Sequence, residues 1–217
     1  MCKDRCETMC KAEINRTGDA GRTDETQPDF SRIVAVTARG LCSRPFPEQI
    51  GRVCRAHPRA LILREKDLTE EEYRELAEKV LAICRNFGVE LIPHSFVKVA
   101  ADLGTESVHL PLDRLRELSG APSLARFRRI GTSVHSAAEA AEAERLGASY
   151  VTAGHIYATD CKRGLPPRGL DFLREVCRST SLPVLAIGGI GLDGKQLREV
   201  LEAGAAGACV MSGMMRL

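Results

Sequence analysis

Residues 129–154, RIGTSVHSAAEAAEAERLGASYVTAG, contain the pattern that decides the fold. A short run rich in β-branched residues is followed by an alanine-rich amphipathic segment closed by Gly147, and then by a second short apolar run. This alternation predicts a strand, a helix and a second strand. Because a strand that returns beside its predecessor through a helix runs parallel to it, the stretch predicts a right-handed βαβ unit.

The same alternation starts near residue 32 and continues to the end of the chain. Short apolar runs, separated by stretches with apolar residues at i, i+3 and i+4, begin at residues 33, 60, 89, 107, 129, 149, 183 and 207. Eight strands in this order predict an α/β fold, a single-domain (β/α)8 TIM barrel over residues 32–217. An open doubly wound sheet is disfavoured because no G-x-G-x-x-G turn follows the first strand.

The segment after the last apolar run is short. Only four residues, 214–217, follow GACVMSG at 207–213, too few for the eighth helix that normally covers the last strand of such a barrel. We therefore expect a barrel that lacks its final helix. A partner subunit, the N-terminal tail or another helix would have to cover the last strand.

The composition of the chain indicates which class of molecule it binds. The 217-residue chain has 31 Lys and Arg against 29 Asp and Glu, a formal net charge of +2, and 4% aromatic residues with no Trp. This charge balance and the scarcity of stacking rings argue against a nucleic-acid partner, so we expect a small molecule. No stretch resembles a membrane span, and the start MCKDRCETMC is unlike a signal peptide. We expect no membrane partner and a cytoplasmic protein.

The cysteines fall into two groups. Residues 1–31 are polar and aperiodic, which predicts a flexible tail, and Cys2, Cys6 and Cys10 lie in it at a spacing that matches no metal signature. No metal site is therefore predicted. The chain has nine cysteines, an odd number, and several of them lie on apolar faces of expected elements: Cys54, Cys84, Cys177 and Cys209. We expect these to be reduced and to pack as small apolar residues.

Chemically versatile residues gather where the expected strands end. In a TIM barrel the loops after the strands converge on one mouth, where the chemistry takes place. Four of the five histidines lie at or near these ends. The residues at these positions are Arg64, Lys66, His94, His109, Ser133, His135, His155, Gly188, Gly189, Met211 and Ser212.

The last two strand ends resemble a phosphate-binding cup. AIGGI at 186–190 places Gly188 and Gly189 after strand seven, and VMSG at 210–213 places Met211 and Ser212 after strand eight. Backbone N–H groups at these two ends commonly bind a phosphate in such barrels. The two glycines would also suit a tight strand-to-helix turn, and both interpretations can hold together.

His135, at the end of strand five, is the candidate acid and base. An imidazole with an ordinary pKa of about 6.5 can take up and return a proton near neutral pH. Ser136 and Glu139 have the S-x-x-E spacing of a helix capping box, which would leave the His135 side chain free for the mouth. His155 is either a second proton carrier or a hydrogen-bonded wall, and the wall is favoured.

The remaining candidates have narrower predicted roles. His109 lies two residues before its loop, so we expect a partly buried structural histidine, whereas His94 is a candidate for a substrate hydrogen bond. Cys161 lies beside Lys162, which could lower the pKa of the thiol and make it a nucleophile. Covalent catalysis is disfavoured because no general base can be assigned to this cysteine.

Several motifs together resemble the TenI branch of the thiamine phosphate synthase/TenI superfamily. The similarity runs from LILREK at 61–66 to the end of the chain. It is most specific in S-V-H-S at 133–136, in GHIYATDCKRGLPPRG at 154–169 and in A-I-G-G-I at 186–190. The resemblance implies a TIM barrel, a homodimer, and a loop after strand six that closes over a thiazole phosphate. The two prolines in this loop would reduce the entropy lost on closure.

TenI-like enzymes are thiazole tautomerases, which aromatise a carboxythiazole phosphate tautomer by moving one proton between carbons. The resemblance assigns the acid/base role to His135 and the phosphate to Gly188, Gly189, Met211 and Ser212. Arg64, Lys66 and Lys162 would meet the substrate carboxylate or other anionic groups. The full set of expected substrate contacts is Arg64, Lys66, His94, Ser133, His155, Thr159 and Lys162. No cofactor is expected for this reaction.

The sister branch, thiamine phosphate synthase, is the alternative function. It joins a pyrimidine diphosphate to thiazole phosphate and requires Mg²⁺, held by an Asn-Asp pair after strand three and an aspartate after strand four. Here Pro93-His94-Ser95 replaces the pair, Asp113 lies one residue off the usual spacing, and Ile62 replaces a glutamine. Mg²⁺ prefers oxygen ligands that this sequence largely lacks at these places. A third hypothesis is a non-catalytic ligand-binding or regulatory protein.

Overall fold

The computed structural model describes residues 28–162 and 164–217, and within them eight parallel strands form one sheet. The order of the strands is β3-β2-β1-β8-β7-β6-β5-β4. Every run expected from the sequence is a strand, so the prediction of eight strands is confirmed. The strands are β1 (Ile33–Val36), β2 (Ala60–Leu63), β3 (Glu90–Pro93), β4 (Ser107–Pro111), β5 (Arg129–Val134), β6 (Tyr150–Gly154), β7 (Val184–Ile187) and β8 (Gly207–Val210).

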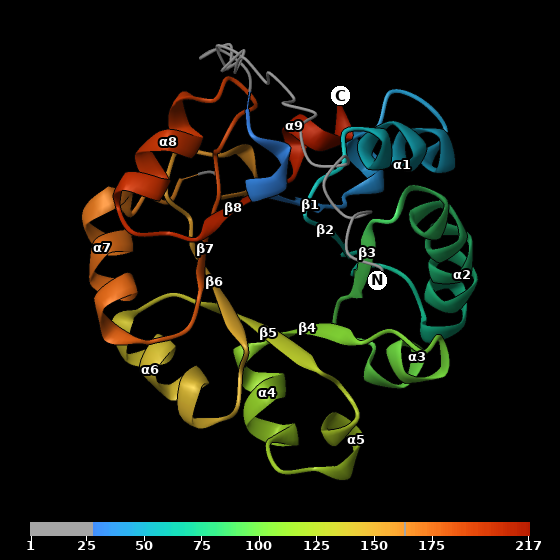
Figure 1. Ribbon diagram of the computed structural model, residues 1–217, viewed down its shortest axis with the longest axis horizontal. Coiled ribbons are helices and arrows are strands. Elements are labelled where there is room, and N and C mark those ends of the chain that lie inside the picture. Colours follow the sequence, from blue (N-terminus) through green and yellow to red (C-terminus); the bar gives the residue numbers. More distant parts are fainter. Residues whose placement is uncertain (1–27, 163) are drawn as a thin grey trace, which may run out of the picture.

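The sheet curls into a barrel with β1 beside β8 and a short seam between β3 and β4 (Figure 1). At the seam His94 and His109 form an isolated parallel bridge, and the Ser95 N–H donates to the His109 carbonyl at 2.9 Å. The helices lie around the outside of the ring (Figure 1). The predicted TIM barrel is therefore confirmed.

Helices and turns connect the strands in the described residues. The amphipathic stretches expected between the strands form helices, among them α2 (Glu70–Phe87), α6 (Ala137–Arg145), α7 (Gly169–Ser179) and α8 (Lys195–Glu202). Thr69 and Glu72 form a full capping box at the start of α2, and Gly88 ends this helix with a positive φ of 66°. The helices are α1 (Phe46–Arg55), α2 (Glu70–Phe87), α3 (Val97–Asp102), α4 (Leu112–Leu118), α5 (Pro122–Ala125), α6 (Ala137–Arg145), α7 (Gly169–Ser179), α8 (Lys195–Glu202) and α9 (Ser212–Met215), with 3-10 turns η1 (Phe30–Arg32), η2 (Arg39–Leu41) and η3 (Asp160–Lys162).

Alternate residues of the strands pack on opposite sides of the barrel wall. On β1, Ile33 and Ala35 belong to the layer between strands and helices, whereas Val34 and Val36 belong to a smaller cluster that includes Tyr150 and Cys209. This division follows from the two-residue period of a strand. The smaller cluster is the filling of the barrel interior, and it places the functional residues above a packed floor.

Helix α9, a single turn, covers the end of the last strand. Its residues Met214 and Met215 are fully buried. The Gln49 side chain on α1 donates to the Met214 carbonyl at 2.7 Å, and Arg44 donates to the Leu217 carbonyl at 2.7 Å. Figure 1 shows α9 next to α1. In the described residues the short helix α9 follows β8, and α1, one of the kinds of cover considered from the sequence, packs against this end.

The cysteines of the described residues are free, as expected. Cys54, Cys84 and Cys209 are buried, and Cys177 is half-buried. The predicted tail begins at residue 1, and its residues 1–27, with Cys2, Cys6 and Cys10, lie outside the described residues; the last part, from residue 28, leads into η1. Within the described part of the chain, no helix has the length and apolarity needed to cross a membrane.

Candidate active site

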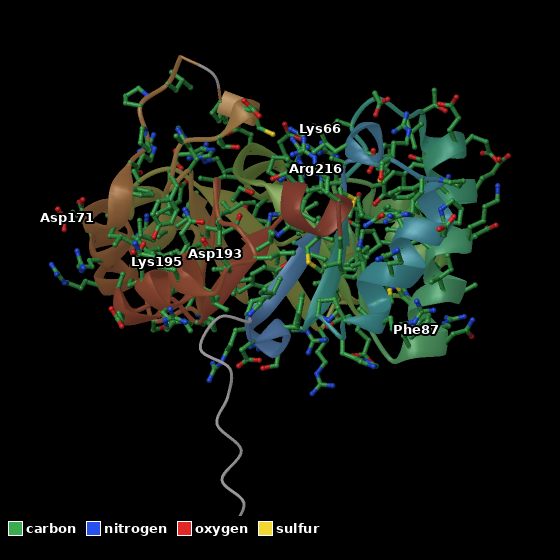
Figure 2. All side chains as sticks on the ribbon, turned by 90° about the horizontal axis from the view of Figure 1, so that it is seen from above. Lys66, Phe87, Asp171, Asp193, Lys195 and Arg216 are labelled. Carbon is green, nitrogen blue, oxygen red and sulfur yellow. The ribbon has the colours of Figure 1, made fainter. Side chains whose placement is uncertain are left out.

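A cavity of about 460 Å³ opens at the carboxyl ends of the strands. In Figure 2, Lys66 lies on the edge of the barrel that carries this mouth, and Phe87, the last residue of α2, lies toward the opposite edge. All twelve residues predicted from the sequence as site residues line the cavity. They are Arg64, Lys66, His94, Ser133, His135, His155, Thr159, Lys162, Gly188, Gly189, Met211 and Ser212.

His135 follows β5 directly and lies on the cavity wall. Its Nδ1 is 3.2 Å from the Gly154 carbonyl oxygen at the end of β6. A carbonyl only accepts, so Nδ1 must carry the hydrogen, and in a neutral imidazole the lone pair then lies on Nε2. One ring nitrogen is thereby held by the barrel, and the other is available to a bound molecule as a proton acceptor.

The capping box predicted at the start of α6 is only half formed. The Ser136 hydroxyl accepts from the Glu139 N–H at 3.1 Å, as predicted. The Glu139 carboxylate, however, accepts from the His135 N–H at 2.5 Å and not from the N–H of Ser136. The predicted bond from the Ser136 N–H to Glu139 was therefore wrong. The chain enters α6 directly from β5, and this path places the N–H of His135, the residue before the cap, beside the Glu139 carboxylate.

The glycine pair after β7 is required by tight packing. Gly188 has a φ of 101° and Gly189 a φ of 72°. A Cβ at Gly188 would lie 2.4 Å from the His155 Cβ, and one at Gly189 would lie 2.4 Å from the Ala158 carbonyl oxygen. The loop after β6 therefore rests on these glycines, and the interpretation as a tight turn is supported by both conformation and space.

The four residues of the predicted phosphate cup line the cavity after the neighbouring strands β7 and β8. Met211 precedes α9, and Ser212 is its first residue. Within the described residues no hydrogen bond uses the N–H of Gly188 or Gly189 or the Ser212 hydroxyl. These groups are donors that an anion could accept from, which is the chemistry that phosphate requires.

Four cationic side chains line the same cavity: Arg64, Lys66, Lys162 and Arg116, the last of which is paired with carboxylates. The pKa of Lys66 is lowered, first by the nearby Arg64 guanidinium, then by partial burial and by Lys162. Among the described residues neither Arg64 nor Lys66 forms an ion pair with a carboxylate. Neighbouring positive charges that repel one another and have no carboxylate partner would be stabilised by an anion. This arrangement predicts that the cavity binds one.

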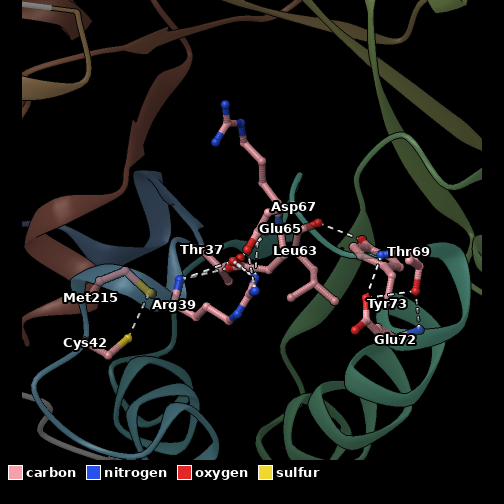
Figure 3. Close-up of polar contacts among 11 residues, drawn as sticks. Thr37, Arg39, Cys42, Leu63, Glu65, Asp67, Thr69, Glu72, Tyr73 and Met215 are labelled. Atoms are coloured by element: carbon pink, nitrogen blue, oxygen red, sulfur yellow. Dashed lines mark hydrogen bonds and ion pairs between the residues drawn. The ribbon is translucent and has the colours of Figure 1, made fainter.

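The peptide that carries Arg64 and Lys66 is fastened to the neighbouring loop by Glu65 (Figure 3). The Glu65 carboxylate is nearly buried and accepts from the Arg39 guanidinium at 2.9 Å and from the Arg39 N–H at 3.1 Å. The Arg39 guanidinium also bonds Asp67, and the Arg64 N–H donates to Thr37 Oγ1 at 2.9 Å. Alternate residues of this segment thus point to opposite sides. Arg64 and Lys66 point to the cavity, and Glu65 points to Arg39.

Replacing Glu65 by alanine is expected to lower the free energy of unfolding by about 1–3 kcal/mol, because the Arg39 donors lose a buried acceptor. It should also weaken binding of inorganic pyrophosphate, since Arg64 and Lys66 lose their fixed positions. Denaturant unfolding and calorimetric titration measure the two effects. Asp67→Asn is the control: this side chain is 69% exposed, so solvent screens its ion pair with Arg39 and the pair should contribute little to stability. Equal stabilities of the two variants would contradict the prediction.

His94 and His109 form a buried pair at the barrel seam. Their rings stack with centroids 5.6 Å apart. His109 is bonded to the Tyr150 hydroxyl at 3.1 Å and to Ser133 Oγ at 3.0 Å, so its predicted structural role agrees with its contacts, although it is fully rather than partly buried. His94 lines the cavity while its Nδ1 is bonded to Ser95 Oγ at 2.7 Å. A substrate hydrogen bond from His94 stays a prediction.

This pair predicts a loss of stability in acid. Burial, then His109 and the cations Arg64 and Lys66, lower the pKa of His94 to about 3, and burial and Arg64 lower that of His109 to about 3. The unfolded chain has ordinary histidines with a pKa of about 6.5, so it binds more protons than the folded chain between these values. Stability is therefore fully present above pH ~6.5 and falls as the pH drops toward about 3.

Urea unfolding at a series of pH values would measure this effect. His94→Asn removes one of the two titrating groups and should make the pH dependence shallower, whereas His57→Asn, a histidine that does not line the cavity, should leave this part of the dependence unchanged. An unchanged slope in His94→Asn would contradict the assignment.

The loop between β6 and α7 forms one wall of the cavity. The N–H groups of Ile156 and Tyr157 donate to the carbonyls of Ile187 and Gly188, each at 3.0 Å. The His155 Nε2 lies 3.4 Å from the Leu165 carbonyl, which agrees with the favoured interpretation of His155 as a hydrogen-bonded wall. Cys161 is exposed and also lines the cavity.

Three charged residues of the rim, Asp113, Arg116 and Glu139, line the cavity but were not predicted from the sequence as site residues. Arg116 on α4 pairs with Asp113 at 2.5 Å and with Glu142 at 2.7 Å. The only signal available for them was their position, because Asp113 and Arg116 closely follow strand four and Glu139 ends the S-x-x-E spacing after strand five. The apolar lining residues also carried no distinctive motif.

The donors at the ends of β3 and β4 do not suit a magnesium ion. Within the described part of the chain no three His, Cys, Asp or Glu residues cluster as metal ligands. Asp113 is the carboxylate nearest in sequence to these ends, and its side chain is 85% exposed and paired with Arg116. Mg²⁺ prefers oxygen ligands, and the His94 imidazole, which is buried at the seam, does not supply one.

Comparisons with known proteins give one consistent result. The sequence profile of a family described as "Thiamine monophosphate synthase" matches residues 33–214. A "Thiamine-phosphate synthase" from Syntrophomonas wolfei is 30% identical over 188 residues, which cover 86% of this chain and 89% of that protein. One from Desulfitobacterium hafniense is 37% identical over 161 residues, covering 71% and 74%.

A solved structure supports the same relationship. The "Thiamine phosphate pyrophosphorylase" from Pyrococcus furiosus has a TM-score of 0.71 and 31% identity, and the match covers 86% of this chain and 88% of that one. The resemblance to the superfamily is thus confirmed, while the names of these relatives are those of the synthase and do not distinguish the TenI branch. With a family match over most of the barrel and relatives at this identity, the chain belongs to the thiamine monophosphate synthase family of thiamine biosynthesis.

Proposed function

We propose that this protein is a thiazole tautomerase of the TenI type, which aromatises a carboxythiazole phosphate tautomer by proton transfer. The observation that carries the proposal is the bond from His135 Nδ1 to the Gly154 carbonyl, since it leaves Nε2 as the proton acceptor at the cavity. The neutral ring takes a proton from one carbon of the substrate. The imidazolium so formed returns a proton to another carbon, so the composition of the substrate is unchanged.

The rest of the cavity suits this substrate class. The N–H groups of Gly188 and Gly189, with Met211 and Ser212, would hold the phosphate ester. Arg64, Lys66 and Lys162 would offset the charge of the carboxylate. An anion held at two places fixes the thiazole ring between them, and such fixed geometry is itself a large contribution to catalysis.

The second candidate is thiamine phosphate synthase, and the names of the similar proteins favour it. The three cations Arg64, Lys66 and Lys162, here called the cationic wall, would also suit a diphosphate. Against it stands the scarcity of oxygen ligands for Mg²⁺ at the ends of β3 and β4, where the Asp113 carboxylate lines the cavity but is paired with Arg116. A non-catalytic ligand-binding or regulatory protein is the third candidate, and it predicts binding without turnover.

One set of assays separates the three candidates. The purified protein is given the carboxythiazole phosphate tautomer without metal, and, separately, the pyrimidine diphosphate and thiazole phosphate with Mg²⁺. Proton NMR follows aromatisation in the first sample, and chromatography follows thiamine phosphate in the second. Aromatisation alone supports the proposal, whereas Mg²⁺-dependent thiamine phosphate formation supports the synthase. Calorimetric binding of the thiazole phosphate with neither product supports the non-catalytic protein.

The homodimer implied by the resemblance stays a prediction. Sedimentation velocity of the full chain would measure its mass against the 23.6 kDa of one copy.

A further inference from the structure

Both peptide groups that flank His135 are held by charged side chains from different elements. On one side the His135 N–H donates to Glu139 Oε2 at 2.5 Å. On the other side Arg168 Nη1 donates to the His135 carbonyl oxygen at 2.5 Å. Charge-assisted hydrogen bonds of this kind are stronger than those between neutral groups.

Arg168 is itself fixed in position. Its N–H donates to the His155 carbonyl at 3.0 Å, and its guanidinium lies over the Phe172 ring with 4.9 Å between the central carbon and the ring centroid. It immediately precedes α7, at the end of the loop after β6. Glu139 belongs to the first turn of α6. The two charged groups therefore reach His135 from two different elements, the loop before α7 and the first turn of α6.

We propose that Arg168 and Glu139 are positioning residues, which direct the His135 imidazole so that Nδ1 bonds Gly154 and Nε2 faces the substrate. The physical reason is geometric. Holding the peptide before and the peptide after a residue fixes its φ and ψ, and φ and ψ fix the direction of the Cα–Cβ bond and the accessible rotamers. The His135 ring is then already oriented for the 3.2 Å contact from Nδ1 to the Gly154 carbonyl.

The size of the effect follows from the sensitivity of catalysis to placement. A displacement of about 1 Å at a reacting group can cost roughly 10²-fold in rate, although binding of the substrate is little changed. Loss of either charged residue is therefore expected to lower kcat by about 10–100-fold with a small change in KM. This inference rests on the proposed role of His135, so its test includes a measurement that does not depend on turnover.

Four variants test the two positions. Arg168→Met removes the donor but keeps a side chain able to pack on Phe172, and Arg168→Lys restores a charged donor. Glu139→Ala removes the acceptor, and Glu139→Gln restores an oxygen. Arg174→Met is the matched control, because Arg174 lies in α7, close to Arg168 in sequence, and forms its ion pair with the fully exposed Asp171. Thermal unfolding of each variant establishes that it folds.

The first measurement is the tautomer of His135, read from ¹⁵N NMR of histidine-labelled protein at alkaline pH. The chain has five histidines, so the His135 signal can be assigned by its absence in His135→Asn. Native protein should show Nδ1–H with an unprotonated Nε2. Arg168→Met and Glu139→Ala should show a mixture of tautomers, whereas Arg168→Lys, Glu139→Gln and Arg174→Met should keep the native pattern.

The second measurement is the split between kcat and KM for the tautomer. The same two variants should lose kcat, and the other three should remain near the native value. A native tautomer pattern in both Arg168→Met and Glu139→Ala would overturn the inference, whatever their rates. If the native protein shows the expected tautomer but no turnover, the proposed function fails and the positioning role stands on the NMR result. If Arg168→Met does not fold, Glu139→Ala against Glu139→Gln decides the outcome.

Discussion

Replacing His135 by asparagine is expected to lower kcat for tautomerisation by about 10²–10⁴-fold, the usual contribution of a general acid and base. Asparagine can still donate to the Gly154 carbonyl, but it cannot take up a proton. Binding of the thiazole phosphate should be nearly unchanged, because the phosphate donors lie on other strands. Rapid-quench or NMR rate measurements give kcat, and calorimetry gives the affinity.

His57→Asn is the matched control for this experiment. It makes the same change at a histidine that does not line the cavity, where the backbone has a φ of 51° that asparagine tolerates. This variant should keep the native rate. Full activity of His135→Asn would refute the assignment of the acid and base, and loss of activity in both variants would point to an effect on folding.

Replacing Gly188 by alanine is expected to lower the stability of the folded chain strongly. The backbone φ of 101° disfavours any side chain by about 1–2 kcal/mol. The added Cβ would also lie 2.4 Å from the His155 Cβ and 2.8 Å from its Cα, and overpacking of this kind costs about 1–3 kcal/mol. Because the neighbour is partly backbone, the loop after β6 must move away.

Two measurements follow for Gly188→Ala. The free energy of unfolding in urea should fall by several kcal/mol, a large share of the roughly 5–15 kcal/mol that stabilises most proteins. Affinity for phosphate esters should fall as well, since the N–H groups of the turn change direction. Gly51→Ala is the control: Gly51 lies within α1 with nothing within 4 Å of an added Cβ, and alanine there should stabilise the helix by about 0.5–1 kcal/mol. Equal stabilities of the two variants would contradict the steric argument.

The stretch 129–154 shows why the fold could be predicted. Its strand, helix and strand differ in hydrophobic period, and the period depends on local geometry alone. Once eight such strands are parallel, their carboxyl ends meet at one mouth, so His135, Gly188 and Ser212 could be placed together without coordinates. The short helices α3, α4 and α5 were not predicted because pieces of four to seven residues are too short to show a helical period.

The contacts that fix the site residues in position could not be predicted from the sequence. Glu139 could be recognised as a helix-capping residue, but only the structure shows that it accepts from the His135 N–H. Arg168 lies 33 positions from His135 in the sequence, and Arg39 lies 26 from Glu65. Contacts at such separations have no local signature.

The sequence by itself determined the order of the strands, the positions of their ends and the kinds of chemistry available at the mouth. These properties follow from residue type and from spacing along the chain. Only the tertiary structure decided which nitrogen of His135 is hydrogen-bonded to the barrel and how the buried pair His94 and His109 closes the barrel. It also decided which side chains fix the positions of Arg64 and Lys66. Those outcomes depend on distances between segments brought together by closure of the barrel, and burial in the closed barrel also lowers the pKa values of the histidine pair.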